Sequence, residues 1–288
     1  MLILMPPIIR LLRPHQWTKN LLVWAPFLFV AGWRNPGAVP LVWLAFGAFC
    51  FVSSATYVCN DLFDVERDRN HPRKSLRPIA SGAIPKGLAA GIAVVLLVLG
   101  LGMAVRVNQQ TMSILTGYVA LQIAYNCGLK NEPVLDVFAI ATGFVLRALA
   151  GAVAISVSAS GWLFACTGLF ALFIGFAKRR GELVTLGSEA RESLTRYSAK
   201  FLDHALTITS SATLVCYALY AISSSTALAH RGLVLTLPVV AFALLRYLLL
   251  VFGRDEGSDP DILLFKDHQL AVSLVLFVVT SIWAMAGS

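Results

Sequence analysis

The stretch AVPLVWLAFGAFCFVSSATYVC at residues 38–59, and the stretch NDLFDVERDRNHP that follows it at residues 60–72, decide the fold. The first stretch is almost wholly apolar, and about 20 such residues make a helix long enough to cross a lipid bilayer. The second stretch is polar and rich in carboxylates. Together they predict a transmembrane helix that ends in an acidic segment at one face of the membrane.

Apolar blocks of similar length recur along the whole chain. They predict an all-α membrane bundle of nine transmembrane helices, folded as one domain over residues 1–288. The predicted spans cover residues 20–33 (extended by an amphipathic segment at 8–19), 38–59, 88–106, 111–128, 134–155, 161–177, 204–223, 233–252 and 269–286. Only 13% of the residues are charged, whereas a soluble domain carries roughly 25%. This shortage of charge excludes a soluble enzyme.

The basic residues are distributed unevenly between the predicted loops. The net charge is +8, and most Lys and Arg residues fall in the N-terminal segment and in the loops at 60–87, 129–133, 178–203 and 253–268. The opposite loops carry only Arg34, Arg106 and Arg231. The positive-inside rule then places the basic side in the cytoplasm. The same distribution argues against a nucleic-acid partner, because the charge lies between apolar blocks instead of forming one continuous stripe.

The acidic segment predicts a metal site. Asn60, Asp64 and Asp68 are four residues apart, so on a continuing helix they share one face, and Asp61 lies beside them. Like charges at this spacing repel each other, which a bound cation would offset. Carboxylates with open coordination positions suit Mg²⁺. We therefore expect Asn60, Asp61, Asp64 and Asp68 to bind Mg²⁺, with the three aspartates as catalytic residues. The alternative is a solvated, charged helix end.

Cations follow the acids directly and recur on the same side of the membrane. Arg and Lys are the usual partners of phosphate oxygens. The predicted substrate-binding residues are Asn60, Lys19, His71, Lys74, Arg77, Tyr125, Lys130, Lys178, Arg179 and Glu182. The alternatives are a basic loop that only orients the protein, an arginine that anchors the helix at the interface, and a simple Lys178–Glu182 pair within one helix.

Arginines inside the membrane are a further feature. Arg147 and Arg246 lie within predicted spans, where a charge is costly and faces the bundle interior or a cavity. Each arginine could equally be a structural tie between helices. Asp136 lies in the first turn of its span, where the helix dipole favours an anion. The five cysteines form no CxxC pair, and motifs such as HExxH, GxSxG and GxxxxGK[ST] are absent, which excludes zinc, hydrolase and P-loop chemistry.

These motifs resemble the UbiA superfamily of membrane prenyltransferases. The NDxxDxxxD pattern of residues 60–68 is similar to the family's first Asp-rich motif, and RPxxSG at residues 77–82 follows it. The family's second acidic motif is replaced here by KRRGEL at residues 178–183. Together with RPxQWxKN at residues 13–20 and HPxKxxRPIA at residues 71–80, this replacement resembles the decaprenyl-phosphate phosphoribosyltransferase branch.

The resemblance implies a Mg²⁺-dependent enzyme of the bacterial inner (cytoplasmic) membrane. It would transfer 5-phosphoribosyl from phosphoribosyl diphosphate to a polyprenyl phosphate and release diphosphate. One alternative is a prenyltransferase that uses a prenyl diphosphate and an aromatic acceptor, and another is a non-catalytic carrier of lipid phosphates. The resemblance leaves the oligomeric state open, a homo-oligomer being one option.

Overall fold

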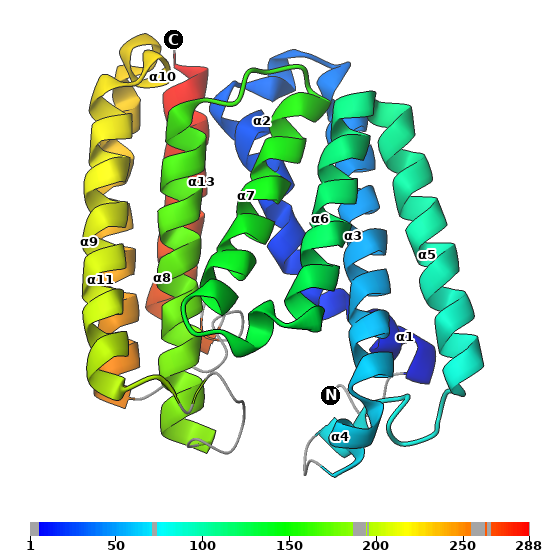
Figure 1. Ribbon diagram of the computed structural model, residues 1–288. Coiled ribbons are helices and arrows are strands. Elements are labelled where there is room, and N and C mark those ends of the chain that lie inside the picture. The colour runs from blue at the N-terminus through cyan, green and yellow to red at the C-terminus, as the bar shows by residue number, and fades with distance from the viewer. Residues whose placement is uncertain are drawn as a thin grey trace.

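The structure is a computed structural model that describes residues 6–70, 74–186, 194, 196–254, 263 and 266–287. These residues are helical and contain no strand (Figure 1). The described helices are α1 (Pro7–Leu12), η2 (Pro14–Trp24), α2 (Ala25–Phe29), η3 (Gly32–Arg34), α3 (Ala38–Phe63), α4 (Val65–Arg69), η4 (Lys74–Leu76), α5 (Lys86–Val107), α6 (Gln109–Cys127), η5 (Leu129–Asn131), α7 (Leu135–Ala154), α8 (Gly161–Leu186), α9 (Ala199–Ser223), α10 (Ser225–Ala229), η8 (Arg231–Thr236), α11 (Leu237–Arg254) and α13 (His268–Ala286).

The predicted all-α membrane fold is confirmed, whereas the predicted count of nine spans is not. Seven of the described helices are long and apolar enough to cross a membrane: α3, α5, α7, α8, α9, η8 with α11, and α13. Helix α6 runs alongside α7 across the bundle (Figure 1), and its 19 residues include several amides that lower its hydropathy. Like α6, the first predicted span, residues 20–33, is not among these seven helices.

The segment predicted as the first span is not one continuous α-helix. Arg13 adopts a left-handed conformation (φ 52°), after which η2 continues as a 3₁₀ helix up to Trp24 and α2 completes the segment. Pro14 and Pro26 lack the N–H that a continuous α-helix would use, which explains the interruptions. The turn at Arg13 carries its side chain to the end of α3.

Helix α8 extends further than its predicted end at residue 177. It continues to Leu186, so the KRRGEL motif lies on the last turns of a helix and not in a loop after it. The Arg179–Glu182 pair, three residues apart on one face, favours this continuation. The consequence is that α8 carries its charges into the polar end of the bundle.

Two glycines permit close contacts between helices of the bundle. A Cβ atom at Gly100 of α5 would meet Val52 and the Ala48 backbone of α3, so these two helices approach closely. A Cβ atom at Gly151 of α7 would collide with the Val23 carbonyl oxygen of η2. Small residues that permit such contacts are typical of helices in membranes. They place α5 beside α3 and α7 beside η2.

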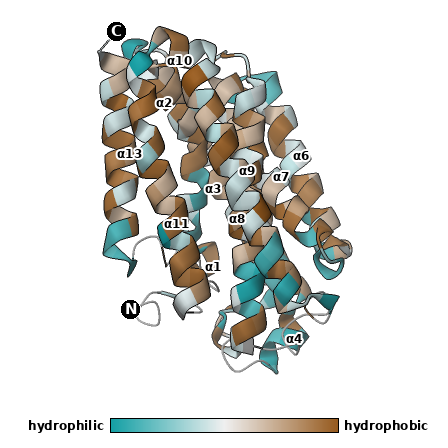
Figure 2. Ribbon diagram, turned by 90° about the vertical axis from the view of Figure 1, so that its left-hand side faces the viewer, coloured by the Kyte–Doolittle hydropathy of each residue, from teal (hydrophilic) through white to brown (hydrophobic). Residues whose placement is uncertain are grey.

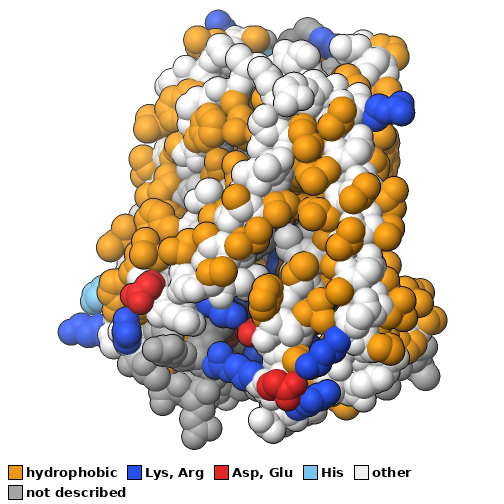
Figure 3. All heavy atoms as spheres, turned by 45° about the vertical axis from the view of Figure 1, so that its right-hand side comes forward, with side chains coloured by type: hydrophobic (Ala, Val, Ile, Leu, Met, Phe, Trp, Pro, Cys, Tyr) orange, Lys and Arg blue, Asp and Glu red, His pale blue; other side chains and the backbone are white. Residues whose placement is uncertain are grey.

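Hydrophobic and charged side chains are separated along the bundle. Large apolar side chains such as Val98, Val215 and Leu245 are exposed on the outer faces of α5, α9 and α11, as a surface in contact with lipid requires. Hydrophilic residues gather around α4 and the lower end of α8 (Figure 2). On the face shown in Figure 3, most Lys, Arg, Asp and Glu side chains lie near the same end. This end holds the candidate site.

Candidate active site

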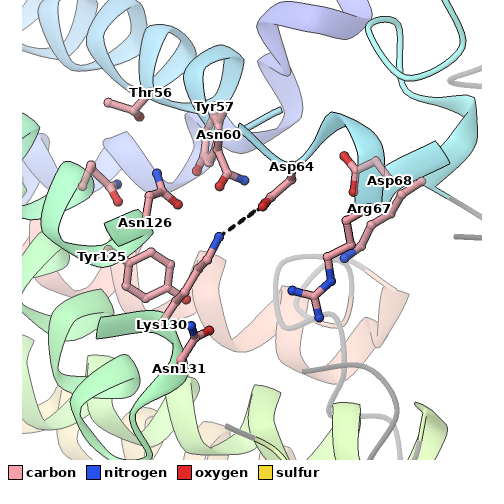
Figure 4. A pocket seen from close by; sticks show the side chains of 12 residues that line it. Thr56, Tyr57, Asn60, Asp64, Arg67, Asp68, Tyr125, Asn126, Lys130 and Asn131 are labelled. Carbon is pink, nitrogen blue, oxygen red and sulfur yellow. Dashed lines mark hydrogen bonds and ion pairs between the residues drawn. The ribbon is translucent and has the colours of Figure 1, made fainter. Parts of the chain in front are cut away.

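A pocket of about 110 Å³ lies at the polar end, between the end of α3 and the end of α6. Figure 4 shows the side chains that point into it. The pocket is lined by Thr56, Tyr57, Asn60, Asp64, Arg67, Asp68, Lys74, Gln122, Tyr125, Asn126, Lys130 and Asn131. Of the predicted site residues, six therefore lie together in one place: Asn60, Asp64, Asp68, Lys74, Tyr125 and Lys130.

The acidic wall of the pocket is formed where α3 passes into α4. The backbone N–H of Asp64 donates to the Asn60 carbonyl at 3.0 Å, and that of Asp68 donates to the Asp64 carbonyl at 2.8 Å. The helical hydrogen-bond pattern thus continues across the junction. Because residues four apart share a face, Asn60, Asp64 and Asp68 line the same pocket, as their spacing predicts.

Asp61 lies outside this pocket lining. Its carboxylate, 2% exposed, accepts hydrogen bonds from Arg13 at 2.6 and 2.8 Å and from Arg77 at 2.9 Å. Arg77 also donates to Asp68 at 2.6 Å, so one guanidinium joins two of the aspartates. In this structure Asp61 fixes the positions of two arginines beside the pocket.

Lys130 is the cation that faces the acidic wall from the opposite side. Its Nζ atom lies 3.2 Å from Asp64 Oδ1, across the pocket from the α3–α4 junction (Figure 4). Lys130 belongs to η5, the short turn between α6 and α7. The pocket therefore brings together opposite charges from two separate parts of the chain. The side chains of Lys130 and Asp64 are both partly exposed.

The other predicted residues lie elsewhere. Lys19 donates to Gln16 at 2.6 Å, and its segment is attached to α3 by the Trp17–Ser54 hydrogen bond of 3.0 Å. Lys178 of α8 is partly buried and does not line the pocket. His71 lies outside the described residues. Arg179 and Glu182 belong to a separate cluster.

This second group, the buried ion cluster, consists of Asp136, Arg179, Glu182 and Tyr197. Arg179 is 1% exposed and donates to Asp136 at 2.5 Å and to Glu182 at 2.5 Å. The Tyr197 hydroxyl donates to Asp136 at 2.9 Å, and burial raises the pKa of this phenol. The hydroxyl therefore stays protonated and keeps its role as a donor.

The buried ion cluster also supports the turn that carries Lys130. Val134, which precedes α7, has a φ of 70°, a strained conformation for a β-branched residue. Its backbone N–H donates to the Tyr197 hydroxyl at 2.5 Å. Arg179 in addition donates to the Tyr125 hydroxyl at 3.4 Å, and Tyr125 lines the pocket. The cluster thus positions parts of the pocket wall from behind.

Sequence reasoning missed the uncharged side of the pocket. Thr56, Tyr57, Gln122, Asn126 and Asn131 all line it, together with Arg67. The signal was present in the fourth predicted span, where Gln122 and Asn126 are four residues apart and so share one face of the helix. Polar side chains on one face of such a helix point to a cavity or a partner.

The two arginines within predicted spans both act as ties. Arg147 donates to Asn20 at 2.8 Å, to the Gly143 carbonyl at 2.7 Å and to the Tyr118 hydroxyl at 2.9 Å. It thereby connects η2, α6 and α7. Arg246 forms an ion pair of 2.7 Å with Asp267, which lowers the pKa of that carboxyl through the hydrogen bond from Arg246.

The pocket holds oxygen donors, although they are not gathered into a closed metal cage. No three His, Cys, Asp or Glu side chains of the described residues converge on one point. Asp64 and Asp68 instead face Lys130 and Arg77. Two carboxylates with an amide on successive turns still match the preference of Mg²⁺, which takes one or two carboxylates and completes its shell with phosphate oxygens and water.

Comparison with known proteins places the chain in a family. It is 36% identical to the decaprenyl-phosphate phosphoribosyltransferase of Corynebacterium glutamicum, over 96% of this chain and 87% of that protein. Identity to the enzyme of the same name from Mycolicibacterium smegmatis is 33%, over 95% and 90% of the two chains. The fold is similar to that of a UbiA homolog from Archaeoglobus fulgidus solved with GPP and Mg²⁺, with a TM-score of 0.75 and 19% identity over 98% of this chain and 100% of that one. Residues 21–267 match the family described as the UbiA prenyltransferase family. The chain therefore belongs to the UbiA prenyltransferase family.

Proposed function

We propose that this protein is a membrane phosphoribosyltransferase. It transfers 5-phosphoribosyl from phosphoribosyl diphosphate to a polyprenyl phosphate of the decaprenyl type and releases diphosphate. The relatives from Corynebacterium glutamicum and Mycolicibacterium smegmatis, which match nearly the whole chain, carry the name of this activity. The lining of the pocket supports the same conclusion independently.

The observation that carries the proposal is the uncharged polar side of the pocket. Its side chains are hydroxyls and amides: Thr56, Tyr57, Gln122, Asn126 and Asn131. Such groups make hydrogen bonds to the hydroxyls of a sugar. A prenyl chain next to the diphosphate would instead require apolar walls at this place. The pocket therefore favours a phosphorylated sugar as the donor.

The charged side of the pocket suits the diphosphate of that donor. Asn60, Asp64 and Asp68 are the residues that would hold a divalent cation, and Mg²⁺ is the ion we propose. Such an ion, when bound, neutralises the negative charge that builds on a leaving diphosphate. Asp61 was predicted as a fourth ligand; from its contacts we assign it instead to holding Arg13 and Arg77 beside the pocket.

The basic residues bind the phosphate groups. Lys130, Lys74 and Arg67 line the pocket, and we assign them to the phosphates of the donor and the lipid. Arg77, which contacts Asp68, is close enough to take part. Lys19, His71, Lys178, Arg179 and Glu182 remain predictions, because they do not belong to the described pocket lining.

The reaction needs no strong base in this scheme. The bond between ribose C1 and the diphosphate oxygen breaks, and its electron pair leaves with the diphosphate. An oxygen of the lipid phosphate, already anionic near neutral pH, forms the new bond to C1 from the opposite face, which inverts the anomeric centre. The residues of the pocket hold both reactants in place, and this positioning supplies a large part of the rate enhancement.

The protein is a multi-pass integral membrane protein, and its topology can be proposed in more detail. The segment η2–α2 and helix α6 would add two crossings to the seven apolar helices, giving nine. The basic end of the bundle, which contains the pocket, would then face the cytoplasm. A water-soluble donor would reach the pocket from this side, and the lipid would enter from the membrane.

The test uses purified protein with Mg²⁺ and radiolabelled donors. With labelled phosphoribosyl diphosphate and polyprenyl phosphate, label should appear in the lipid fraction and diphosphate should be released. Label transferred only from a prenyl diphosphate to an aromatic acid would show an aromatic prenyltransferase instead. Binding of lipid phosphate without diphosphate release would show a carrier.

A further inference from the structure

Arg147 carries a positive charge inside the bundle and forms no ion pair with a carboxylate of the described residues. It is 5% exposed, and none of the ion pairs between described residues includes it. Its guanidinium lies 4.8 Å from the Tyr118 ring centroid and 5.5 Å from that of Phe144. A buried charge in a membrane is costly and is retained where it has a function or a partner. A structural tie alone could be made by neutral groups.

The contacts of Arg147 lead to the pocket. Its Nη2 atom donates to the Tyr118 hydroxyl at 2.9 Å. The amide nitrogen of Gln122 donates to the same hydroxyl at 2.6 Å. Gln122 lines the pocket, whereas Tyr118 is fully buried behind it. A continuous polar path therefore runs from the buried charge through one hydroxyl to the pocket wall.

This path fixes the position of Gln122. The Gln122 side chain has several rotamers. Holding it in one rotamer before the donor binds lowers the entropy cost of binding. Tyr118 holds the amide nitrogen of Gln122, and Arg147 in turn holds Tyr118. Arg147 is itself held by Asn20 at 2.8 Å and by the Gly143 carbonyl at 2.7 Å. Every member of the path is thus fixed by a neighbour on another helix or another turn.

We infer that Arg147 is a positioning residue that acts through Tyr118 to hold the Gln122 amide against the sugar–phosphate part of the donor. The inference rests on the proposed function, since it assigns a partner to one group of the uncharged wall. The buried positive charge adds a favourable field for an anionic donor, because charges interact more strongly away from bulk water. The groups that touch the donor remain on the wall itself.

The decisive variant is Tyr118→Phe, which removes the hydroxyl and keeps the ring that faces Arg147. One hydrogen bond in the path is lost, so the KM for phosphoribosyl diphosphate should rise about tenfold with little change in kcat. The matched control is Tyr217→Phe. Its hydroxyl is also buried and contacts Thr236 at 2.6 Å, in a part of the bundle away from the pocket. It should shift the melting temperature by a similar amount and leave the KM unchanged.

A double-mutant cycle with Gln122→Ala separates positioning from general destabilisation. If Tyr118 acts through Gln122, Tyr118→Phe should add nothing to the KM once Gln122 is alanine. Additive effects on the KM, or an unchanged KM in Tyr118→Phe, would overturn the inference. Wild-type protein that fails to bind phosphoribosyl diphosphate at all would overturn the proposed function instead. Arg147→Lys should raise the KM as Tyr118→Phe does, because an ammonium cannot reproduce the fork of donors.

Discussion

The α3–α4 wall of the pocket and the buried ion cluster contain the same chemical groups in different surroundings. Both pair carboxylates with basic side chains. In the pocket, the Lys130–Asp64 pair has side chains that are 17% and 26% exposed. In the cluster, the Arg179–Asp136 pair has side chains that are 1% and 0% exposed. The comparison teaches that exposure, and not residue type, separates the Lys130–Asp64 pair, which can exchange a partner for a ligand, from the Arg179–Asp136 pair, which holds the fold.

The residues of the cluster still matter for the pocket, because the two regions meet at the α6–α7 turn. Tyr197 holds Val134 and Arg179 contacts Tyr125. Damage to the cluster should therefore reduce stability first and activity as a result. Damage to the pocket should reduce activity alone. Four substitutions test this division.

The largest effect is expected for Asp64→Asn. Losing this carboxylate removes a proposed ligand of the divalent cation, so turnover should fall more than about a thousandfold while the melting temperature in detergent changes little. The control is Glu66→Gln on α4, where the carboxylate is exposed and pairs with Lys86 at 3.1 Å. Its activity should stay within about twofold of wild type. Normal turnover in Asp64→Asn would remove this residue from the metal site.

Arg179→Met should have the next largest effect, this time on stability. It leaves Asp136 buried without its cation, which costs about 3 kcal/mol of unfolding free energy. Thermal denaturation in detergent measures the change. Arg196→Gln is the control, since Arg196 forms only an exposed pair with Glu132 at 3.3 Å. A variant Arg179→Met that keeps its melting temperature and loses activity would place Arg179 with the pocket after all.

Lys130→Met should raise the KM for an anionic substrate about tenfold, because one charged contact to a phosphate is lost. Its stability should change little, since its partner Asp64 is partly solvated. Steady-state kinetics with each substrate varied in turn would show which phosphate Lys130 binds. Lys200→Met, an exposed lysine of α9, is the matched control. Equal KM values for both substrates in wild type and Lys130→Met would contradict the assignment.

Tyr197→Phe should give the smallest effect, a loss of about 1 kcal/mol of stability from the missing hydroxyl. The pKa of Tyr197 is raised by burial above its ordinary value, which is about 10. Its contribution is therefore complete below that pH and is lost as the pH rises through the folded pKa. Stability measured against pH should fall less steeply at alkaline pH in Tyr197→Phe than in wild type. An identical alkaline profile would show that this phenol does not titrate with unfolding.

The sequence predicted those features that depend on periodicity. Long apolar runs identified most helices, and the spacing of Asn60, Asp64 and Asp68 placed them on one face. It could not separate Asp61 from them, because the partner Arg13 arrives from 48 residues away through a left-handed turn. Arg179, which the sequence predicts to bind substrate, pairs with Asp136 of another helix, and this contact could not be predicted from the sequence. Long-range pairing decides such roles, and no local pattern records it.

The contact between Gly151 and Val23 has a consequence well beyond packing. One helical turn separates Gly151 from Arg147, and about one turn of the 3₁₀ helix separates Val23 from Asn20, so both contacts belong to a single crossing. A methyl group at position 151 would push the first segment outward and pull Asn20 from Arg147. A screen of random variants for lost activity should therefore recover Gly151→Ala, because the crossing leaves no room for an extra carbon atom. Gly151 itself has no side chain that could take part in the reaction.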